Sequence, residues 1–105
     1  MGKINWTEKA STHLQGIHDY IAKDSKIYAT RFIRSLIKAT LKLETMPLCG
    51  RIVPEFADYG LREVIYGNYR IVYRITEGEG NVEILAVVHG AREIKKVMYE
   101  EWELN

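Results

Sequence analysis

With 105 residues, the chain is long enough for one domain with a single hydrophobic core. Hydrophobic residues make up 47% and aromatic residues 10%, which is typical of a globular protein rather than a disordered one. The 15 basic and 14 acidic residues nearly cancel, which disfavours a non-specific nucleic-acid binder, because such proteins are usually strongly basic. A role in anion binding would therefore depend on local clustering of charge.

The compartment is predicted from what the sequence lacks. Cys49 is the only cysteine, so an internal disulfide is excluded and a reducing environment is favoured. The N-terminus has no apolar core of a signal peptide, and no apolar run approaches the roughly 20 residues of a membrane span. We expect a soluble, cytoplasmic protein without a membrane partner.

The N-terminal half predicts a short strand followed by two helices. Residues 3–6 can form the strand, and Thr7 is a good N-cap for a helix over residues 7–23. Ser25 is a second N-cap, for a longer helix over residues 25–46 that Pro47 ends. Apolar residues recur at helical spacing in both segments, at Ala10, Leu14, Ile17 and Ile21 and at Ala29, Phe32, Ile33, Leu36, Ile37 and Leu43.

The C-terminal half changes to the period of a strand. A loop over residues 48–60 precedes three β-rich runs that begin near Leu61, Tyr69 and Asn81. Gly67-Asn68 is a two-residue hairpin signal, and residues 77–80 supply the next turn. A short helix is expected after Ala91. The sequence thus predicts a single α+β domain over residues 1–105, with an N-terminal strand and a two-helix hairpin packed on a small antiparallel sheet, and a short C-terminal helix.

The two helices are expected to cover one face of the sheet. Strand alternation and helical spacing predict a core of Ala10, Leu14, Ile17, Phe32, Leu36, Ile71, Tyr73 and Leu85. The opposite face would be open, or half covered by the C-terminal helix, and would carry Arg62, Val64, Arg70, Val72 and Arg74.

The arginines of this region are the candidate functional residues, and two interpretations stay open. Arg62, Arg70, Arg74 and Arg92 could form surface ion pairs with Glu63, Glu77, Glu83 and Glu93. They could instead form a guanidinium patch that binds phosphates or a carboxylate-bearing partner. His89 and Tyr99 could add acid–base groups at the edge of the patch, although such residues are more often structural.

Other kinds of site find little support in the sequence. His13, His18 and His89 lack partners at metal-ligand spacing, so no metal is predicted. Gly78 and Gly80 do not form a phosphate loop, and no cofactor is expected. Cys49 has no base near it in the sequence, and a free cysteine is more often a small apolar filler than a nucleophile.

The order of several short motifs resembles the RelE/ParE superfamily of bacterial type II toxins. The motifs are Trp6-Thr7 before the first helix, Asp19-Tyr20-Ile21-Ala22, Ala29-Thr30-Arg31-Phe32-Ile33, Pro47 with Gly50-Arg51, Leu61-Arg62-Glu63, Tyr69-Arg70-Ile71-Val72-Tyr73 and Val88-His89-Gly90-Ala91-Arg92. Each motif is weak, but their order and spacing cover nearly the whole chain.

The resemblance implies a small α+β toxin that inhibits growth and is neutralised by a cognate antitoxin. RelE-like members cleave mRNA on the ribosome, and ParE-like members poison DNA gyrase. By resemblance, Arg70 matches an arginine used at the scissile phosphate, Arg62 a basic residue of the preceding strand, Arg92 another active-site arginine, and Tyr99 lies within one position of a catalytic tyrosine. Val64 stands where a second basic residue is expected, which counts against ribonuclease activity.

Three functions follow from the resemblance. The two-helix hairpin, the near-neutral charge and Val64 favour a ParE-like gyrase poison. A ribosome-dependent endoribonuclease is the alternative, and an inactive relative that only binds an antitoxin is the third. The sequence does not predict the oligomeric state.

Overall fold

The computed structural model describes residues 2–76, 78, 80–90 and 94–102, with the backbone alone for residues 99–102. Five strands form one sheet in the order β1-β5-β4-β3-β2. All neighbouring strands are antiparallel except β1 and β5, which are parallel. The strands are β1 (Ile4–Trp6), β2 (Arg51–Ile52), β3 (Arg62–Tyr66), β4 (Tyr69–Ile75) and β5 (Val82–His89).

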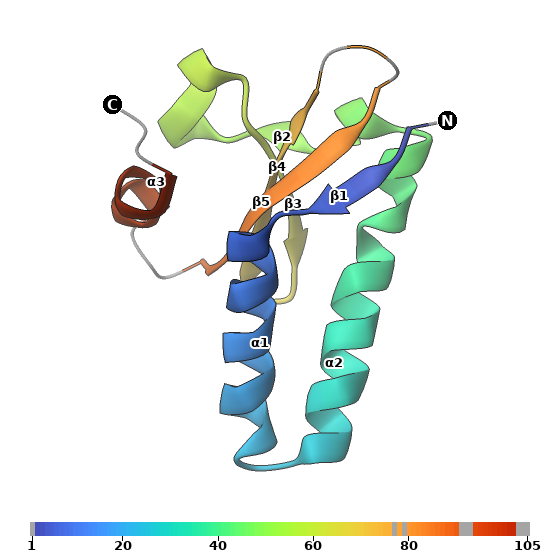
Figure 1. Ribbon diagram of the computed structural model, residues 1–105, viewed down its shortest axis with the longest axis vertical. Coiled ribbons are helices and arrows are strands. Elements are labelled where there is room, and N and C mark those ends of the chain that lie inside the picture. The colour runs from blue at the N-terminus through green and yellow to red at the C-terminus, as the bar shows by residue number, and fades with distance from the viewer. Residues whose placement is uncertain (1, 77, 79, 91–93, 103–105) are drawn as a thin grey trace.

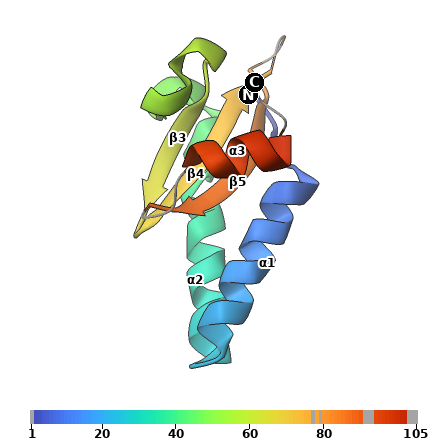
Figure 2. The ribbon, with the colours of Figure 1, turned by 90° about the vertical axis from the view of Figure 1, so that its left-hand side faces the viewer.

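The helices lie on both sides of this sheet. Helix α1 (Glu8–Ala22) and helix α2 (Lys26–Ala39) form an antiparallel arm that extends well beyond the strands, and α3 (Ile94–Trp102) crosses the other side (Figures 1 and 2). Two short 3-10 helices, η1 (Leu41–Glu44) and η2 (Pro47–Cys49), connect α2 to β2, and a third, η3 (Pro54–Tyr59), connects β2 to β3. The predicted fold class is confirmed.

Local signals in the sequence position the first elements as expected. The side chain of Thr7 accepts a hydrogen bond from Ala10 N and that of Ser25 accepts one from Tyr28 N, so both predicted N-caps are confirmed. The long second helix ends at Ala39, before the predicted boundary, because the chain tightens into η1. Gly67 has a φ of 57° in the predicted hairpin turn, a conformation that glycine adopts at no steric cost.

Helix α1 also covers the part of β5 that β1 does not reach. β1 pairs with residues 82–84 only. Where β1 ends, Thr7 Oγ1 donates to Ile84 O at 2.8 Å, and farther along β5 Val87 N donates to His13 Nδ1 at 3.1 Å. Because unpaired backbone groups are costly when buried, these two side chains replace the missing strand and fix the arm against the sheet.

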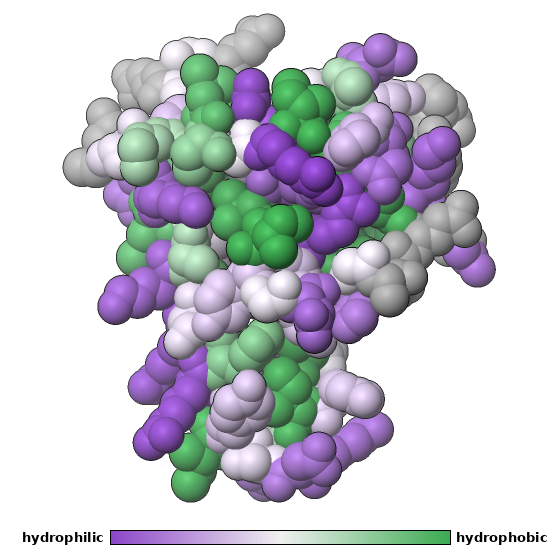
Figure 3. Space-filling model, turned by 180° about the vertical axis from the view of Figure 1, so that it is seen from behind, coloured by the Kyte–Doolittle hydropathy of each residue, from purple (hydrophilic) through white to green (hydrophobic). Residues whose placement is uncertain are grey.

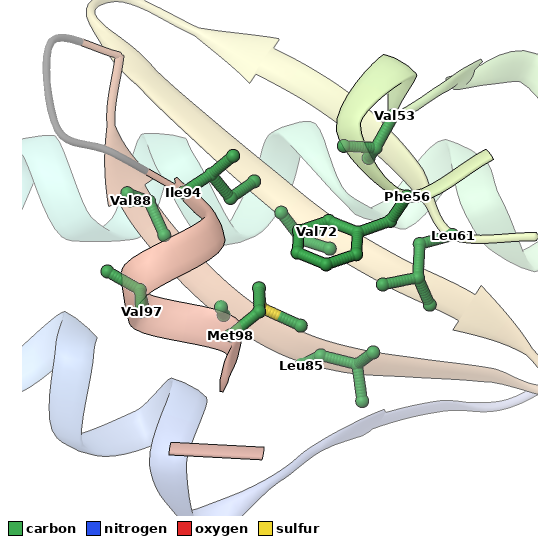
Figure 4. Packing of buried hydrophobic residues seen from close by; sticks show 10 residues of the cluster. Val53, Phe56, Leu61, Val72, Leu85, Val88, Ile94, Val97 and Met98 are labelled. Carbon is green, nitrogen blue, oxygen red and sulfur yellow. The ribbon is translucent and has the colours of Figure 1, made fainter. Parts of the chain in front are cut away.

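The sheet has a hydrophobic core on each face. On the face of the arm, the buried residues are Ala10, Leu36, Leu43, Val64, Ile71, Tyr73, Val82, Ile84 and Val87, with Leu14, Ile17 and Phe32 partly buried against them. On the opposite face, Val72, Leu85, Ala86 and Val88 pack against η3 and α3 through Val53, Phe56, Leu61, Ile94, Val97 and Met98 (Figure 4). The sheet is thus the middle layer of three.

Two predictions about the faces are wrong. Leu85 belongs to the second core, because the pairing shifts register between Val72 and Tyr73 and leaves Leu85 as an extra residue in β5. Arg62 and Val64 lie on the face of the arm rather than beside Arg70, because Ile65 is the residue of β3 that pairs with Arg70. Val72 is fully buried, so the arginine face is covered rather than open.

Leu36 provides a test of the core on the arm side. Leu36→Ala should lower the free energy of unfolding by about 2–5 kcal/mol, because it removes a fully buried side chain and leaves a cavity. Leu41→Ala is the matched control, since Leu41 is 50% exposed, and it should cost under about 1 kcal/mol. Urea unfolding monitored by circular dichroism measures both values. Equal losses in the two variants would show that the assignment of the buried face is wrong.

Candidate functional site

A buried carboxylate lies at the centre of the candidate site. Glu63, in β3, has a fully buried side chain. Its Oε2 accepts from Nε of Arg51 in β2 at 2.6 Å, and its Oε1 accepts from Nε of Arg70 in β4 at 2.5 Å. Since an ionised carboxylate is stable in the interior only when it is paired, the two arginines compensate the buried charge of Glu63 within the fold.

The other nitrogens of Arg70 bind a second carboxylate. Nη1 and Nη2 donate to Glu55, in η3, at 3.0 and 2.9 Å, in a bidentate arrangement. The hydrogen bonds from Arg70 lower the pKa of Glu55 to about 2, and they and Glu63 raise the pKa of Arg70 above its ordinary value. The side chain of Arg70 is only 11% exposed. Two carboxylates therefore neutralise the guanidinium that the sequence singled out for phosphate binding.

A groove of about 470 Å³ lies beside this network, at the tip of the β3–β4 hairpin. It is lined by Arg51, Ile65, Gly67, Asn68, Tyr69, Arg70, His89 and Gly90. The ring of His89 packs against Tyr69 edge-on, with centroids 5.3 Å apart, and burial raises the pKa of Tyr69. The structure thus brings Arg70 and His89 to one groove, but an anion there would have to compete with Glu55 for Arg70.

Arg62 and Arg74 lie away from the groove. Arg62 donates from Nη1 to the carbonyl oxygens of Gly50 at 2.7 Å and Leu48 at 3.3 Å, and so it holds the segment before β2. Arg74 pairs with Glu83 across β4 and β5 at 2.6 Å and remains 55% exposed. Arg74 therefore forms a surface ion pair as the first interpretation predicts, Arg70 forms a buried one, and the three described arginines do not form a single patch.

The structure does not describe the side chains of the remaining candidates. Arg92 lies outside the described residues, as do Glu77 and Glu93, and of Tyr99 only the backbone is described, within α3. Among the described residues, no group of three His, Cys, Asp or Glu side chains could hold a metal ion. No helix in the described part of the chain has the length and apolar character needed to cross a bilayer.

Arg51 and Glu55 are the site residues that the sequence did not reveal. Both lie in the segment predicted to be a loop, where no periodic pattern relates a residue to its partner. Arg51 could have been found from β2, since it pairs directly with Glu63. Glu55 had no such signal, because it reaches Arg70 from a 3-10 helix outside the sheet.

Gly50 allows this segment to approach the sheet. A Cβ atom at this position would lie 2.5 Å from the hydroxyl oxygen of Tyr73 and 2.7 Å from the carbonyl oxygen of Glu63. The Tyr73 hydroxyl instead accepts from Gly50 N at 3.0 Å and donates to Pro47 O at 2.6 Å. The close contact explains why glycine is needed immediately before Arg51.

The low pKa of Glu55 predicts a dependence of stability on pH. A folded-state pKa of about 2, below the ordinary 4.5, means that the contribution of Glu55 is present above pH 4.5 and is lost as the pH falls towards 2. Glu55→Gln should therefore destabilise the protein at pH 7 by about 1–2 kcal/mol, a value reduced for solvent screening, and the difference from wild type should vanish near pH 2.

Urea unfolding at a series of pH values measures this difference. Asp58→Asn, which replaces an exposed carboxylate of the same 3-10 helix, is the control and should change the stability by less than about 0.5 kcal/mol. A pH-independent effect of Glu55→Gln would show that the ion pair with Arg70 does not hold η3.

Comparisons with known proteins agree with this architecture. A family model described as "ParE toxin of type II toxin-antitoxin system, parDE" matches residues 4–94. The chain is similar to a solved structure of the chromosomal ParDE toxin–antitoxin system from P. aeruginosa, with a TM-score of 0.67 and 22% identity over 85% of this chain and 96% of that chain. It is also similar to the RelBE2 toxin–antitoxin complex from Mycobacterium tuberculosis, with a TM-score of 0.63 and 23% identity over 84% of this chain and 96% of that chain.

Comparison with curated protein sequences gives no match. The two structural likenesses, at these low identities, support the fold, and the family match supports the assignment. Because that match extends from β1 to the start of α3, the chain belongs to the ParE toxin family of type II toxin–antitoxin systems.

Proposed function

We propose that this toxin arrests growth by binding and inhibiting DNA gyrase, rather than by cleaving RNA. The observation that carries the proposal is the state of Arg70. Its Nε, Nη1 and Nη2 all donate to carboxylates of the chain itself. A ribonuclease needs guanidinium groups that are free to stabilise a phosphate as charge develops on it. Arg70 is instead committed to holding β3, β4 and η3 together.

The position of Val64 supports the same conclusion. Val64 is buried against the two-helix arm, on the face opposite Arg70. A basic residue at this position would be buried in the core in this arrangement, where an unpaired charge is costly. The absence of the second basic residue is thus consistent with the packing of the strand, and Arg62 is turned to the same face.

The endoribonuclease stays the second candidate, because Arg70 and His89 line one groove. It would require Glu55 to leave Arg70 when RNA binds, and His89, Arg92 or Tyr99 to supply the acid–base chemistry. The third candidate, an inactive protein that only binds an antitoxin, would use the same fold without any target.

We also propose that a cognate antitoxin binds along the free edge of the sheet. β2 pairs with Arg62 and Glu63 only, so the outer edge of β3 beyond Glu63 has no strand beside it among the described residues. Exposed apolar side chains flank this edge, namely Leu48, Ile52 and Ile65, which are 66%, 41% and 54% exposed. An extended antitoxin segment could add a strand here and cover them.

The choice of target is tested with two assays of the purified chain. We expect inhibition of gyrase supercoiling and no codon-aligned cleavage in a translating-ribosome assay. The informative variant is Arg70→Met with Glu63→Met, because it removes both charges of the buried pair, whereas Arg70→Ala alone would leave one oxygen of the buried Glu63 carboxylate without its partner. Arg51 and Glu55, which each lose a partner in the double variant, are partly exposed to solvent. If Arg70 is structural, this double variant should inhibit gyrase within about threefold of wild type.

Three outcomes separate the candidates. Gyrase inhibition without RNA cleavage supports the proposal. Ribosome-dependent cuts that disappear in the double variant, with supercoiling unaffected, would establish the endoribonuclease. Activity in neither assay, with tight antitoxin binding, would identify the inactive relative.

The antitoxin surface is tested with the reading frame next to this gene. Co-expression should rescue growth, and the two proteins should co-purify. Ile52→Asp with Ile65→Asp should weaken the complex at least about tenfold, since it places charges in an apolar contact. Ile27→Asp, which alters an isoleucine that is 69% exposed on α2, is the control and should leave the affinity unchanged in isothermal titration. Equal affinity of all three proteins would place the antitoxin elsewhere.

A further inference from the structure

The near-zero net charge of the chain conceals a strong segregation of charge. Six of the 15 basic residues, but only one of the 14 acidic residues, lie between Lys23 and Lys42. This segment contains the whole of α2, and the rest of the chain is therefore acidic on balance. Because basic residues outnumber acidic ones six to one in this segment, the near-neutral total does not exclude nucleic-acid binding here.

The cations of α2 form one continuous strip. Arg31, Arg34 and Lys38 follow the spacing i, i+3, i+7, and Lys42 in η1 continues it, opposite the buried Ala29 and Leu36. All four basic residues are exposed. Hydrophilic side chains accordingly line the outer margin of the arm in Figure 3, on the side of α2. Lys26 to Lys38 span about 18 Å along the axis at the α-helical rise.

Within the described structure, none of these cations has an ionic partner. Arg51, Arg70 and Arg74 are paired with glutamates, whereas Arg31, Arg34, Lys38 and Lys42 make no ion pair with any described residue. The arm thus carries a group of cations, unpaired among the described residues, in one strip, away from the ion-paired arginines of the sheet.

Two features of this arrangement oppose the stability of the helix, whereas Lys38 in its last turn favours it. Arg34 and Lys38 are like charges four residues apart, as are Lys38 and Lys42. The first turn of α2 contains Lys26 and no acidic residue, although the positive end of a helix dipole favours an acidic one. A helix that keeps such repulsion without an internal partner fits an external polyanion.

We propose that the α2 strip binds the phosphate backbone of duplex DNA without sequence preference. A docked protein would need apolar anchors at the centre of its contact, but the most exposed apolar residues, Ile27 and Leu41, flank the central cations, and Ile37 between them is only 37% exposed. Single strands are usually held by aromatic stacking. Phe32, the one aromatic residue between Arg31 and Lys42, packs against the core, and the exposed Tyr28 lies only at the start of the strip. B-DNA, with one charge per about 1.7 Å, offers a dense row of phosphates to a projecting helix.

The test uses fluorescence anisotropy of a labelled 20-base-pair duplex of arbitrary sequence with the purified full chain. If about four cations contact phosphates, log Kd should change with log salt concentration with a slope of about 4 in magnitude. Arg31→Gln, Arg34→Gln and Lys38→Gln combined should reduce this slope to about 1 and weaken binding at least about tenfold at 100 mM salt. Glutamine preserves helix propensity, and thermal unfolding confirms the fold.

Lys3→Gln, Lys95→Gln and Lys96→Gln combined form the matched control, because they remove the same charge from exposed positions outside the arm. The control should bind within about twofold of wild type. Equal weakening by both triple variants, or no weakening by the first, would overturn the proposal. So would equally tight binding of a single-stranded 20-mer, or equally effective competition by polyglutamate, which would indicate an acidic protein partner. The probe contains no gyrase or ribosome, so this result does not depend on the proposed target.

Discussion

The arrangement of the sheet depends on one buried negative charge. Removing a carboxylate from water costs several kcal/mol unless the charge is paired, and Glu63 is paired twice, with Arg51 and Arg70. These contacts connect β2, β3 and β4 through side chains, and Arg70 extends them to η3 through Glu55. Because η3 carries Phe56 into the second core, the ion network and the hydrophobic packing on this face stabilise each other.

A sheet covered on both faces leaves little room for an arginine surface. Where both faces are packed, an inward side chain must be apolar or must find an internal partner. Val72 is apolar and buried, and Arg70 has internal carboxylate partners. Arg74, near the end of β4, remains exposed and paired with Glu83. The accessible surfaces are therefore the strand edge near β2, the groove at the β3–β4 hairpin and the outer side of α2. The proposed contacts with other molecules all lie on these surfaces.

Local signals in the sequence were sufficient for most of the elements. The N-caps, the helical stripes and the Gly67-Asn68 turn depend on residues close in the chain, and the structure contains all of them. The errors concern relations between segments. Alternation within each strand predicts Arg62 beside Arg70, whereas the relation between strands depends on register, which pairs Ile65 with Arg70. A bulge moves Leu85 to the opposite face, and no spacing rule relates Glu55, in a 3-10 helix, to Arg70, in a strand 15 residues away.

The cations gathered on α2 give one side of a nearly neutral molecule a positive local charge. Near a polyanion, the attraction of the positive side turns such a molecule, even where the net force on the whole molecule is small. Rotation is fast compared with translation over the same distance, so the chain would present α2 first in most encounters. The effect acts within about one Debye length, near 8 Å at physiological salt, where individual charges rather than their sum determine the approach. Net charge and isoelectric point are therefore poor guides to how this protein meets its partners.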